Sequence, residues 1–161
     1  MALEQAEKPL GTVVLELYTD IAPATCKNFL EFVKGCPKGQ YKNSPIHRVV
    51  KNGWIQGGDV VDGSGKGDPG FVLPDETFAV KHDAPGILGM ANKGESHTAN
   101  TQFYITLSPL PFLDGKRVAF GKVLTKTGME YVESLQNLPL YQNERPVPDV
   151  HVMSVSVLHE P

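Results

Sequence analysis

Apolar and polar positions alternate over the first predicted strand. Between Gly11 and Tyr18, the apolar residues at positions 13, 15 and 17 alternate with other residue types, and Val14 is the exception. A period of two is typical of a half-buried β-strand. Residues 1–9 show no such period, so we predict a loose N-terminal tail there and a folded domain over residues 10–161.

The next segment changes to the period of a helix. Pro23 stands at its start, where proline is favoured, and Gly35 is well placed to end it. The apolar residues between them are spaced at i, i+3, i+4 and i+7, and they are Cys26, Phe29, Leu30 and Val33. This spacing predicts a helix with one buried face.

From residue 46 to residue 120 the pattern changes again, to short apolar runs separated by clusters of Gly, Pro, Asn and Asp. Several short strands with frequent turns are typical of an all-β sandwich or barrel. The predicted strands are Ile46–Val50, Trp54–Gln56, Ile87–Ala91, Phe103–Leu107 and Val118–Phe120.

The last part of the chain predicts one more helix and one more strand. Thr127 is followed three residues later by Glu130, which is the spacing of a capping box at the start of a helix. Val132 and Leu135 would form the inward face of this helix, and the alternation over Val150–Leu158 predicts the final strand. This order of elements predicts an all-β fold, a closed barrel with two helices plugging its ends.

The composition narrows the classes of partner. The chain has 161 residues, of which 40% are hydrophobic and 20% charged, and this fits one globular domain. A net charge of -3 argues against a surface that binds nucleic acid through its phosphates. No apolar run reaches the length of about 18 residues that a membrane span needs. We therefore expect neither nucleic acid nor a membrane as a partner.

The two cysteines, Cys26 and Cys36, do not form a metal-ligand pattern. Cys26 lies on the apolar face of the first predicted helix, which favours a buried free thiol over a disulfide. Free thiols indicate a reducing compartment, so we expect a cytoplasmic location, with the nucleus as the alternative.

Other candidate motifs predict no cofactor and no metal. The glycine-rich stretch over residues 63–70 lacks the Lys-Ser/Thr ending of a phosphate-binding loop, and Pro69 interrupts it where a helix should begin. The five histidines show no spacing typical of metal ligands. We interpret the glycine-rich stretch as an ordinary loop and the histidines as structural or surface residues.

The most informative block runs from residue 46 to residue 59. Arg48 lies on a predicted strand between apolar neighbours, which is unusual for an arginine unless it is paired or functional. One interpretation is a structural arginine, whose aliphatic chain packs over the rim of a barrel while its charged end stays in water. The Gln-Gly-Gly-Asp turn that begins at Gln56 favours a functional role instead.

Several motifs in this order resemble those of the cyclophilins, the peptidyl-prolyl cis-trans isomerases. The resemblance runs from about residue 11 to residue 158. It implies an eight-stranded antiparallel barrel capped by two helices, and an enzyme that isomerises the bond before proline. The motifs that carry it are His47-Arg48, Gln56-Gly57-Gly58-Asp59, Pro85–Asn92, Gln102–Thr106, Leu113-Asp114-Gly115-Lys116 and Phe120-Gly121-Lys122-Val123.

The resemblance also implies roles for individual residues. Arg48 would stabilise the twisted prolyl amide, and Gln56 and Asn92 would complete the catalytic group by holding the substrate backbone. The predicted substrate-binding residues are His47, Trp54, Ala91, Lys93, Gln102, Tyr104, Phe112, Leu113 and Arg117.

The proline pocket departs from the family pattern. Gly53 and Trp54 stand where most cyclophilins have phenylalanine and an apolar residue, so either the aromatic wall is missing or Trp54 supplies it. Tyr104 replaces a phenylalanine, and its hydroxyl needs a partner. Phe112 replaces the tryptophan associated with cyclosporin binding, so we expect weak or no cyclosporin binding. Arg117 replaces a histidine.

These departures resemble the divergent isomerase-like branch of the family, in which some members bind proline peptides with little catalysis. Two functions remain open from the sequence. The first is an isomerase with reduced turnover, and the second is a non-catalytic module that binds proline-containing peptides or proteins. Either would act as a monomer without a cofactor or a metal.

Overall fold

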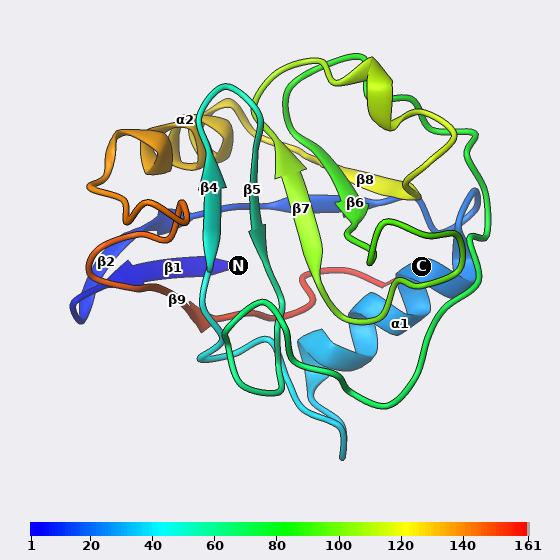
Figure 1. Ribbon diagram of the computed structural model, residues 1–161, viewed down its shortest axis with the longest axis horizontal. Helices are drawn as coiled ribbons and strands as arrows, with labels where there is room; N and C mark the ends of the chain where they lie inside the picture. Colours follow the sequence, from blue (N-terminus) through cyan, green and yellow to red (C-terminus); the bar gives the residue numbers. More distant parts are fainter. Residues whose placement is uncertain (161) are drawn as a thin grey trace.

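The computed structural model describes residues 1–160, which form nine strands, two α-helices and two short 3₁₀ turns. All strand pairs are antiparallel, and they form two sheets (Figure 1). The three-stranded sheet has the order β2 (Lys8–Thr12), β1 (Ala2–Gln5), β9 (Val150–Ser154). The six-stranded sheet has the order β3 (Leu15–Leu17), β8 (Ala119–Val123), β6 (Ile87–Met90), β7 (Phe103–Thr106), β5 (Trp54–Gly57), β4 (Arg48–Val50).

The closed eight-stranded barrel is not confirmed, because the strand pairings form two sheets instead of one ring. Backbone hydrogen bonds nevertheless join the sheets. The segment before β4 meets β9 through Asn43 N to Val152 O (2.7 Å) and Ile46 N to Val150 O (2.8 Å). Leu124 N also donates to Val14 O at 2.8 Å, which extends the β3–β8 pairing into the short link between β2 and β3. The fold is mostly β with two helices.

The prediction of a loose tail over residues 1–9 was wrong. β1 lies in the middle of the three-stranded sheet, and its Leu3 is only 1% exposed and pairs with Val152 of β9. The sequence concealed this strand because Leu3 is its only large buried apolar residue. One of its two neighbours, β9, also comes from the opposite end of the chain, where no local pattern could reveal the pairing.

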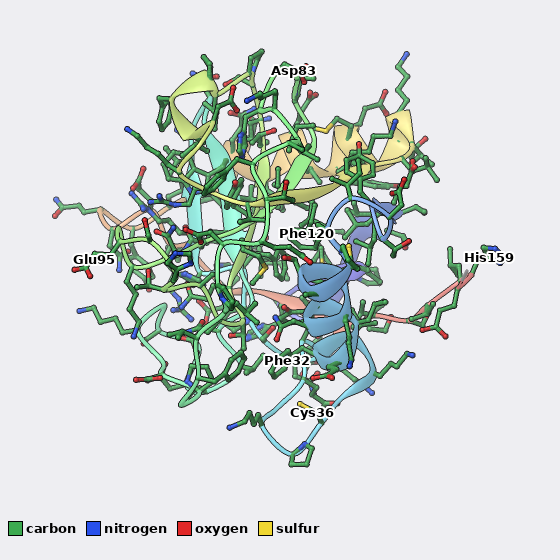
Figure 2. The ribbon with its side chains drawn as sticks, turned by 90° about the vertical axis from the view of Figure 1, so that its right-hand side faces the viewer. Phe32, Cys36, Asp83, Glu95, Phe120 and His159 are labelled. Atoms are coloured by element: carbon green, nitrogen blue, oxygen red, sulfur yellow. The ribbon has the colours of Figure 1, made fainter. Side chains whose placement is uncertain are left out.

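The first helix, α1 (Pro23–Lys34), begins and ends where the sequence predicted. Cys26, Phe29 and Val33 are buried as expected, while Phe32 takes the buried position expected of Leu30. The Cys26 thiol is free and hydrogen-bonds to Phe120 O, and burial raises its pKa to about 12. Figure 2 shows Phe120 near one end of α1 and Cys36 beyond the other.

A carboxylate from a distant loop caps the start of α1. The two oxygens of Glu76 accept hydrogen bonds from the backbone N–H groups of Ala24 (2.8 Å) and Thr25 (2.9 Å), and from the Thr25 hydroxyl. These are N–H groups that a helix leaves without partners inside it. Nearby, Leu73 N donates to Ala99 O at 2.7 Å, so the segment that carries Glu76 also contacts the loop after β6.

The second helix, α2 (Lys126–Ser134), continues into a 3₁₀ turn over Leu135–Asn137, and Val132 and Leu135 are buried as predicted. The predicted capping residue was wrong by two positions. Thr125 caps the helix, because its hydroxyl accepts a hydrogen bond from Gly128 N at 3.0 Å. Within residues 1–160, no helix combines the length and apolar character that a membrane crossing requires.

Candidate functional site

Strand register brings the main predicted site residues onto one face of the six-stranded sheet. Arg48 pairs with Gln56 across β4 and β5, and Gln56 pairs with Tyr104 across β5 and β7. Residues directly opposite each other in antiparallel strands point to the same face, as do residues two apart along one strand. Trp54 therefore shares the face of Arg48, Gln56 and Tyr104, which favours an aromatic wall supplied by Trp54.

A chain of side-chain hydrogen bonds fixes the amide of Gln56. Trp54 Nε1 donates to Gln56 Oε1 at 3.2 Å, and Gln56 Nε2 donates to Gln102 Oε1 at 3.1 Å. Gln102 Nε2 in turn donates to the backbone carbonyl of Gly65 at 2.9 Å. Each amide is thus oriented by its neighbour, and the glycine-rich loop forms the end of the chain.

The glycine-rich loop is folded around Asp59. The carboxylate accepts hydrogen bonds from four backbone N–H groups, those of Val61 (3.0 Å), Asp62 (3.3 Å), Gly65 (2.8 Å) and Gly67 (2.9 Å). Burial alone would raise the pKa of Asp59, but the four donors outweigh it and lower the pKa to about 2. The loop therefore binds its own carboxylate and holds the Gly65 carbonyl against Gln102.

His47 packs against this loop. A Cβ built on Gly65 would lie 2.7 Å from His47 Cδ2, and φ of Gly65 is +90°, so only glycine fits there. His47 is 8% exposed, its Nδ1 has no hydrogen-bond partner among residues 1–160, and burial lowers its pKa. Its role as a substrate-binding residue stays a prediction.

Arg48 is held by a carboxylate that the sequence did not reveal. Its Nε and Nη2 donate to the same oxygen of Glu144, Oε1, at 3.1 and 3.0 Å. The guanidinium also lies over the Trp54 ring, 5.3 Å from its centre. The two charged side chains are 43% and 36% exposed. Arg48 is therefore both paired and present on the candidate site.

Tyr104 has the partner that its hydroxyl needs. It is 3% exposed, and its oxygen lies 2.6 Å from Nε2 of His82, which is fully buried. His82 Nδ1 lies 2.8 Å from Asp114 Oδ1, which also accepts the His82 backbone N–H at 2.7 Å. Because a carboxylate only accepts, Nδ1 carries the proton, and in the neutral ring Nε2 accepts from the tyrosine hydroxyl. We call these three side chains the floor network.

Two further observations support the floor network. Burial raises the pKa of Tyr104, and the hydrogen bonds from the backbone and ring of His82 lower the pKa of Asp114. Gly89 lies opposite Tyr104 in the ladder, and a Cβ on it would collide with the tyrosine oxygen. The hydroxyl and the end of the ring that carries it thus occupy space that is open only because residue 89 is glycine.

The remaining predicted residues lie just after β6 and in the loop after β7. Ala91 N donates to Gln102 O at 3.0 Å, which ties the end of β6 to the start of β7. Asn92 Nδ2 donates to Lys116 O at 3.2 Å, and its Oδ1 accepts from Gly94 N at 2.8 Å. Asn92 is therefore linked to the loop that contains Leu113 and Arg117.

Leu113 and Arg117 are half-buried, and Arg117 N donates to Leu113 O at 3.1 Å. Phe112 is 57% exposed beside them, and Lys93 is exposed with its Nζ 4.0 Å from Asp68. No hydrogen bond links these four residues directly to Arg48 or Gln56 within residues 1–160. Their contacts with a peptide stay predictions.

Comparison with known proteins decides the family. The model of the family described as cyclophilin type peptidyl-prolyl cis-trans isomerase/CLD matches residues 1–157. The chain belongs to the cyclophilin family. This confirms the resemblance drawn from the sequence motifs.

Curated relatives of this cyclophilin domain include proteins named as isomerases and proteins named as probable inactive isomerases. Human probable inactive peptidyl-prolyl cis-trans isomerase-like 6 is 47% identical over 149 residues, covering 86% of this chain and 47% of that protein. Peptidyl-prolyl cis-trans isomerase 11 of Caenorhabditis elegans is 44% identical and covers 86% of this chain and 78% of that protein. The chain spans about half the length of the human relative.

Solved cyclophilins share the fold. The crystal structure of a Cryptosporidium parvum cyclophilin type isomerase has a TM-score of 0.84 and 36% identity, and it covers 94% of both chains. A second structure of that protein, obtained in the presence of the dipeptide Ala-Pro, has a TM-score of 0.84 and 35% identity and covers 94% of this chain and 95% of that one.

Proposed function

We propose that this cyclophilin domain isomerises X-Pro bonds in peptides or proteins, with Arg48 stabilising the twisted prolyl amide. The observation that carries the proposal is the common face of Arg48, Trp54, Gln56 and Tyr104, three of them linked by strand register. In this arrangement Arg48 is a hydrogen-bond donor for the prolyl amide and the oriented amide of Gln56 can bind the substrate backbone. The ring of Tyr104 supplies an apolar surface.

The chemistry needs no nucleophile. The barrier to rotation of a peptide bond, about 18–20 kcal/mol, arises from amide resonance. Twisting the bond localises the lone pair on the prolyl nitrogen, so a donor directed at that nitrogen stabilises the twisted state more than the planar one. A guanidinium suits this role because it stays protonated and presents its donors in a fixed plane.

Arg48 alone does not supply the whole effect. Bringing the reaction to the millisecond range requires about 10⁴–10⁵-fold acceleration, or roughly 5.5–7 kcal/mol. A hydrogen bond to a charged group contributes about 1.5–3 kcal/mol. The remainder must come from holding the flanking peptide while the bond turns, which we assign to Gln56, Asn92 and the surface around Tyr104.

The test is exchange NMR on an Ala-Pro peptide with the wild type, Arg48→Ala and Lys27→Ala. Lys27 is an exposed lysine of α1 and serves as the matched control for loss of a cation. We expect the wild type and the Lys27 variant to accelerate exchange, and Arg48→Ala to lose at least about tenfold. Equal acceleration by the wild type and Arg48→Ala would refute the proposal.

A second candidate is a module that binds proline-containing peptides without turnover. It is favoured by the contact of Glu144 with Arg48, which occupies two of the donors that catalysis needs. Trp54 is the only tryptophan in the sequence, so its fluorescence reports on peptide bound at this face. A fluorescence change on peptide titration without exchange acceleration would support binding alone.

The expected weak binding of cyclosporin has the same readout, because Trp54 lies on the face of the candidate site. We expect little change of Trp54 fluorescence at cyclosporin concentrations that saturate a drug-sensitive cyclophilin. The monomeric state and the cytoplasmic or nuclear location are further proposals, which gel filtration and imaging of a tagged chain would test.

A further inference from the structure

We propose that Glu144 restrains Arg48 and thereby limits the turnover of this domain, so that removing its charge increases isomerisation. This inference rests on the proposed isomerase function. It concerns a positioning residue that acts through Arg48, and no motif in the sequence indicated it.

The carboxylate of Glu144 accepts from one edge of the Arg48 guanidinium, the edge formed by Nε and Nη2. A guanidinium has five N–H donors, and Glu144 Oε1 accepts two of them, one from Nε and one from Nη2. The Trp54 ring lies 5.3 Å from the guanidinium carbon. Arg48 is therefore already ion-paired before a peptide binds, and Glu144 and Trp54 set its orientation.

The fold fixes Glu144 in this position. Its carbonyl accepts the N–H of Val49 at 2.7 Å, directly beside Arg48 on β4, and its own N–H donates to Tyr141 O at 2.9 Å. Its φ is +68°, a left-handed conformation that is uncommon outside glycine. Figure 1 shows the orange segment before β9 passing close to β4. The carboxylate is thus delivered to Arg48 by a backbone bonded to the same strand.

The neighbouring charged residue strengthens this placement. Arg145 donates to both oxygens of Asp149 at 2.8 and 3.0 Å and to the carbonyl of Gly63 at 2.7 Å. These bonds anchor the loop that carries Glu144. Among residues 1–160, Glu144 is the only acidic residue within ion-pair distance of Arg48.

The pair weakens the effect that Arg48 has on a substrate. A lone pair developing on the prolyl nitrogen is stabilised by the positive charge of the guanidinium, and a carboxylate 3.0 Å from Nη2 opposes that charge. Gln56 Oε1 accepts from Trp54 Nε1, and within residues 1–160 no hydrogen bond joins it to Arg48. A neutral acceptor in place of the Glu144 carboxylate keeps the arginine oriented and increases the net positive charge of the site.

The decisive variant is Glu144→Gln, which keeps the shape and an acceptor oxygen but removes the charge. We expect kcat/KM for an X-Pro peptide to rise about two- to fivefold, the range that corresponds to an exposed ion pair. Peptide affinity, followed by Trp54 fluorescence, should change less than kcat. The matched control is Glu130→Gln, an exposed acid of α2, which should leave kcat/KM unchanged.

Two further measurements separate this role from a structural one. In an Arg48→Ala background, Glu144→Gln should have no effect on kcat/KM. Raising the ionic strength should bring the wild type closer to Glu144→Gln, because salt screens an exposed pair. A gain that persists without Arg48, or a kcat/KM of Glu144→Gln equal to or below the wild type, overturns the proposal.

Failure of this inference differs from failure of the proposed function. If the wild type is active and sensitive to Arg48→Ala, but Glu144→Gln is slower, Glu144 assists Arg48 and only the restraint is refuted. If neither the wild type nor Glu144→Gln accelerates exchange, both proposals fail. Trp54 fluorescence then shows whether the candidate site still binds peptide.

Discussion

Arg48 and Tyr104 lie on the same face of the six-stranded sheet, with only β5 between their strands, yet their polar groups are held in different surroundings. The guanidinium of Arg48 pairs with Glu144 where both side chains remain more than a third exposed. The hydroxyl of Tyr104 pairs with His82, a residue without exposed surface. One contact is an ion pair in water, and the other is a hydrogen bond in the interior.

The difference separates stability from chemistry. A buried polar group that loses its partner keeps the full cost of its desolvation, whereas an exposed ion pair contributes little to stability and is screened by salt. The floor network should therefore contribute mainly to the free energy of unfolding, and the Arg48–Glu144 pair mainly to the rate at which the site acts on a substrate. The predictions below test this division.

The largest expected effect is on the floor network. His82→Ala should lower the free energy of unfolding by about 2–4 kcal/mol, because it leaves a cavity and removes the partner of the buried Tyr104 hydroxyl. Urea denaturation measures this loss. The control is His159→Ala, at the exposed edge seen in Figure 2, which should have no effect. A loss below about 1 kcal/mol for His82→Ala would contradict the division.

The next effect concerns Asp59, a buried carboxylate behind the candidate site. Its folded pKa of about 2 lies below the unfolded value, so its contribution is present above about pH 4 and is lost as the pH falls through about 2. The contribution is about 2 kcal/mol.

Asp59→Asn should therefore be less stable than the wild type at pH 7, and this difference should shrink as the pH approaches 2. Urea denaturation at several pH values gives the comparison. Other carboxylates titrate in both proteins, so the difference between the two proteins is the informative quantity. A difference independent of pH would show that the charge of Asp59 is not responsible.

A smaller effect is expected for Tyr104→Phe. The substitution leaves the His82 Nε2 without its donor and should cost about 1–2 kcal/mol of unfolding free energy. A double-mutant cycle sharpens the test. Gly89→Ala should be strongly destabilising in the wild type and in the Tyr104→Phe background alike, because its Cβ meets the tyrosine ring carbons as well as the oxygen, and much less so in a Tyr104→Ala background, which lacks the ring. Additive effects of Gly89→Ala and Tyr104→Ala would show that the ring does not fill the space beside residue 89.

The smallest expected change in stability belongs to the Arg48 side. Glu144→Ala should change the free energy of unfolding by less than about 1 kcal/mol, because both partners are exposed. The same urea measurement applies, repeated at low and high salt. A loss as large as that of Tyr104→Phe would show that the two sides are held by contacts of similar strength.

Local pattern predicted the elements whose signals lie close together in the sequence. Three of the four residues that predicted the buried face of α1 are buried, and the register of Arg48 with Gln56 follows from one short hairpin. The resemblance to cyclophilins supplied the roles of these residues, which periodicity could not.

Contacts between distant segments were not predictable in the same way. Glu144 lies 96 residues from Arg48, and His82 lies 22 residues from Tyr104 across a strand and a loop. Neither spacing has a periodic signature, because sheet order decides which segments meet. The hydroxyl of Tyr104 did indicate that some partner must exist, and only its identity required the structure.

The capping of α1 by Glu76 has a consequence for the far side of the molecule. The segment that carries Glu76 also bonds to the loop after β6, through Leu73 and Ala99 and through Asp75, whose N–H donates to His97 at 2.8 Å. That loop begins beside Lys93. We therefore expect a sequence change in the first turn of α1, such as one at Thr25, to alter the support of the loop that contains Lys93. Variation there would change that loop from a distance, without any contact with a bound peptide.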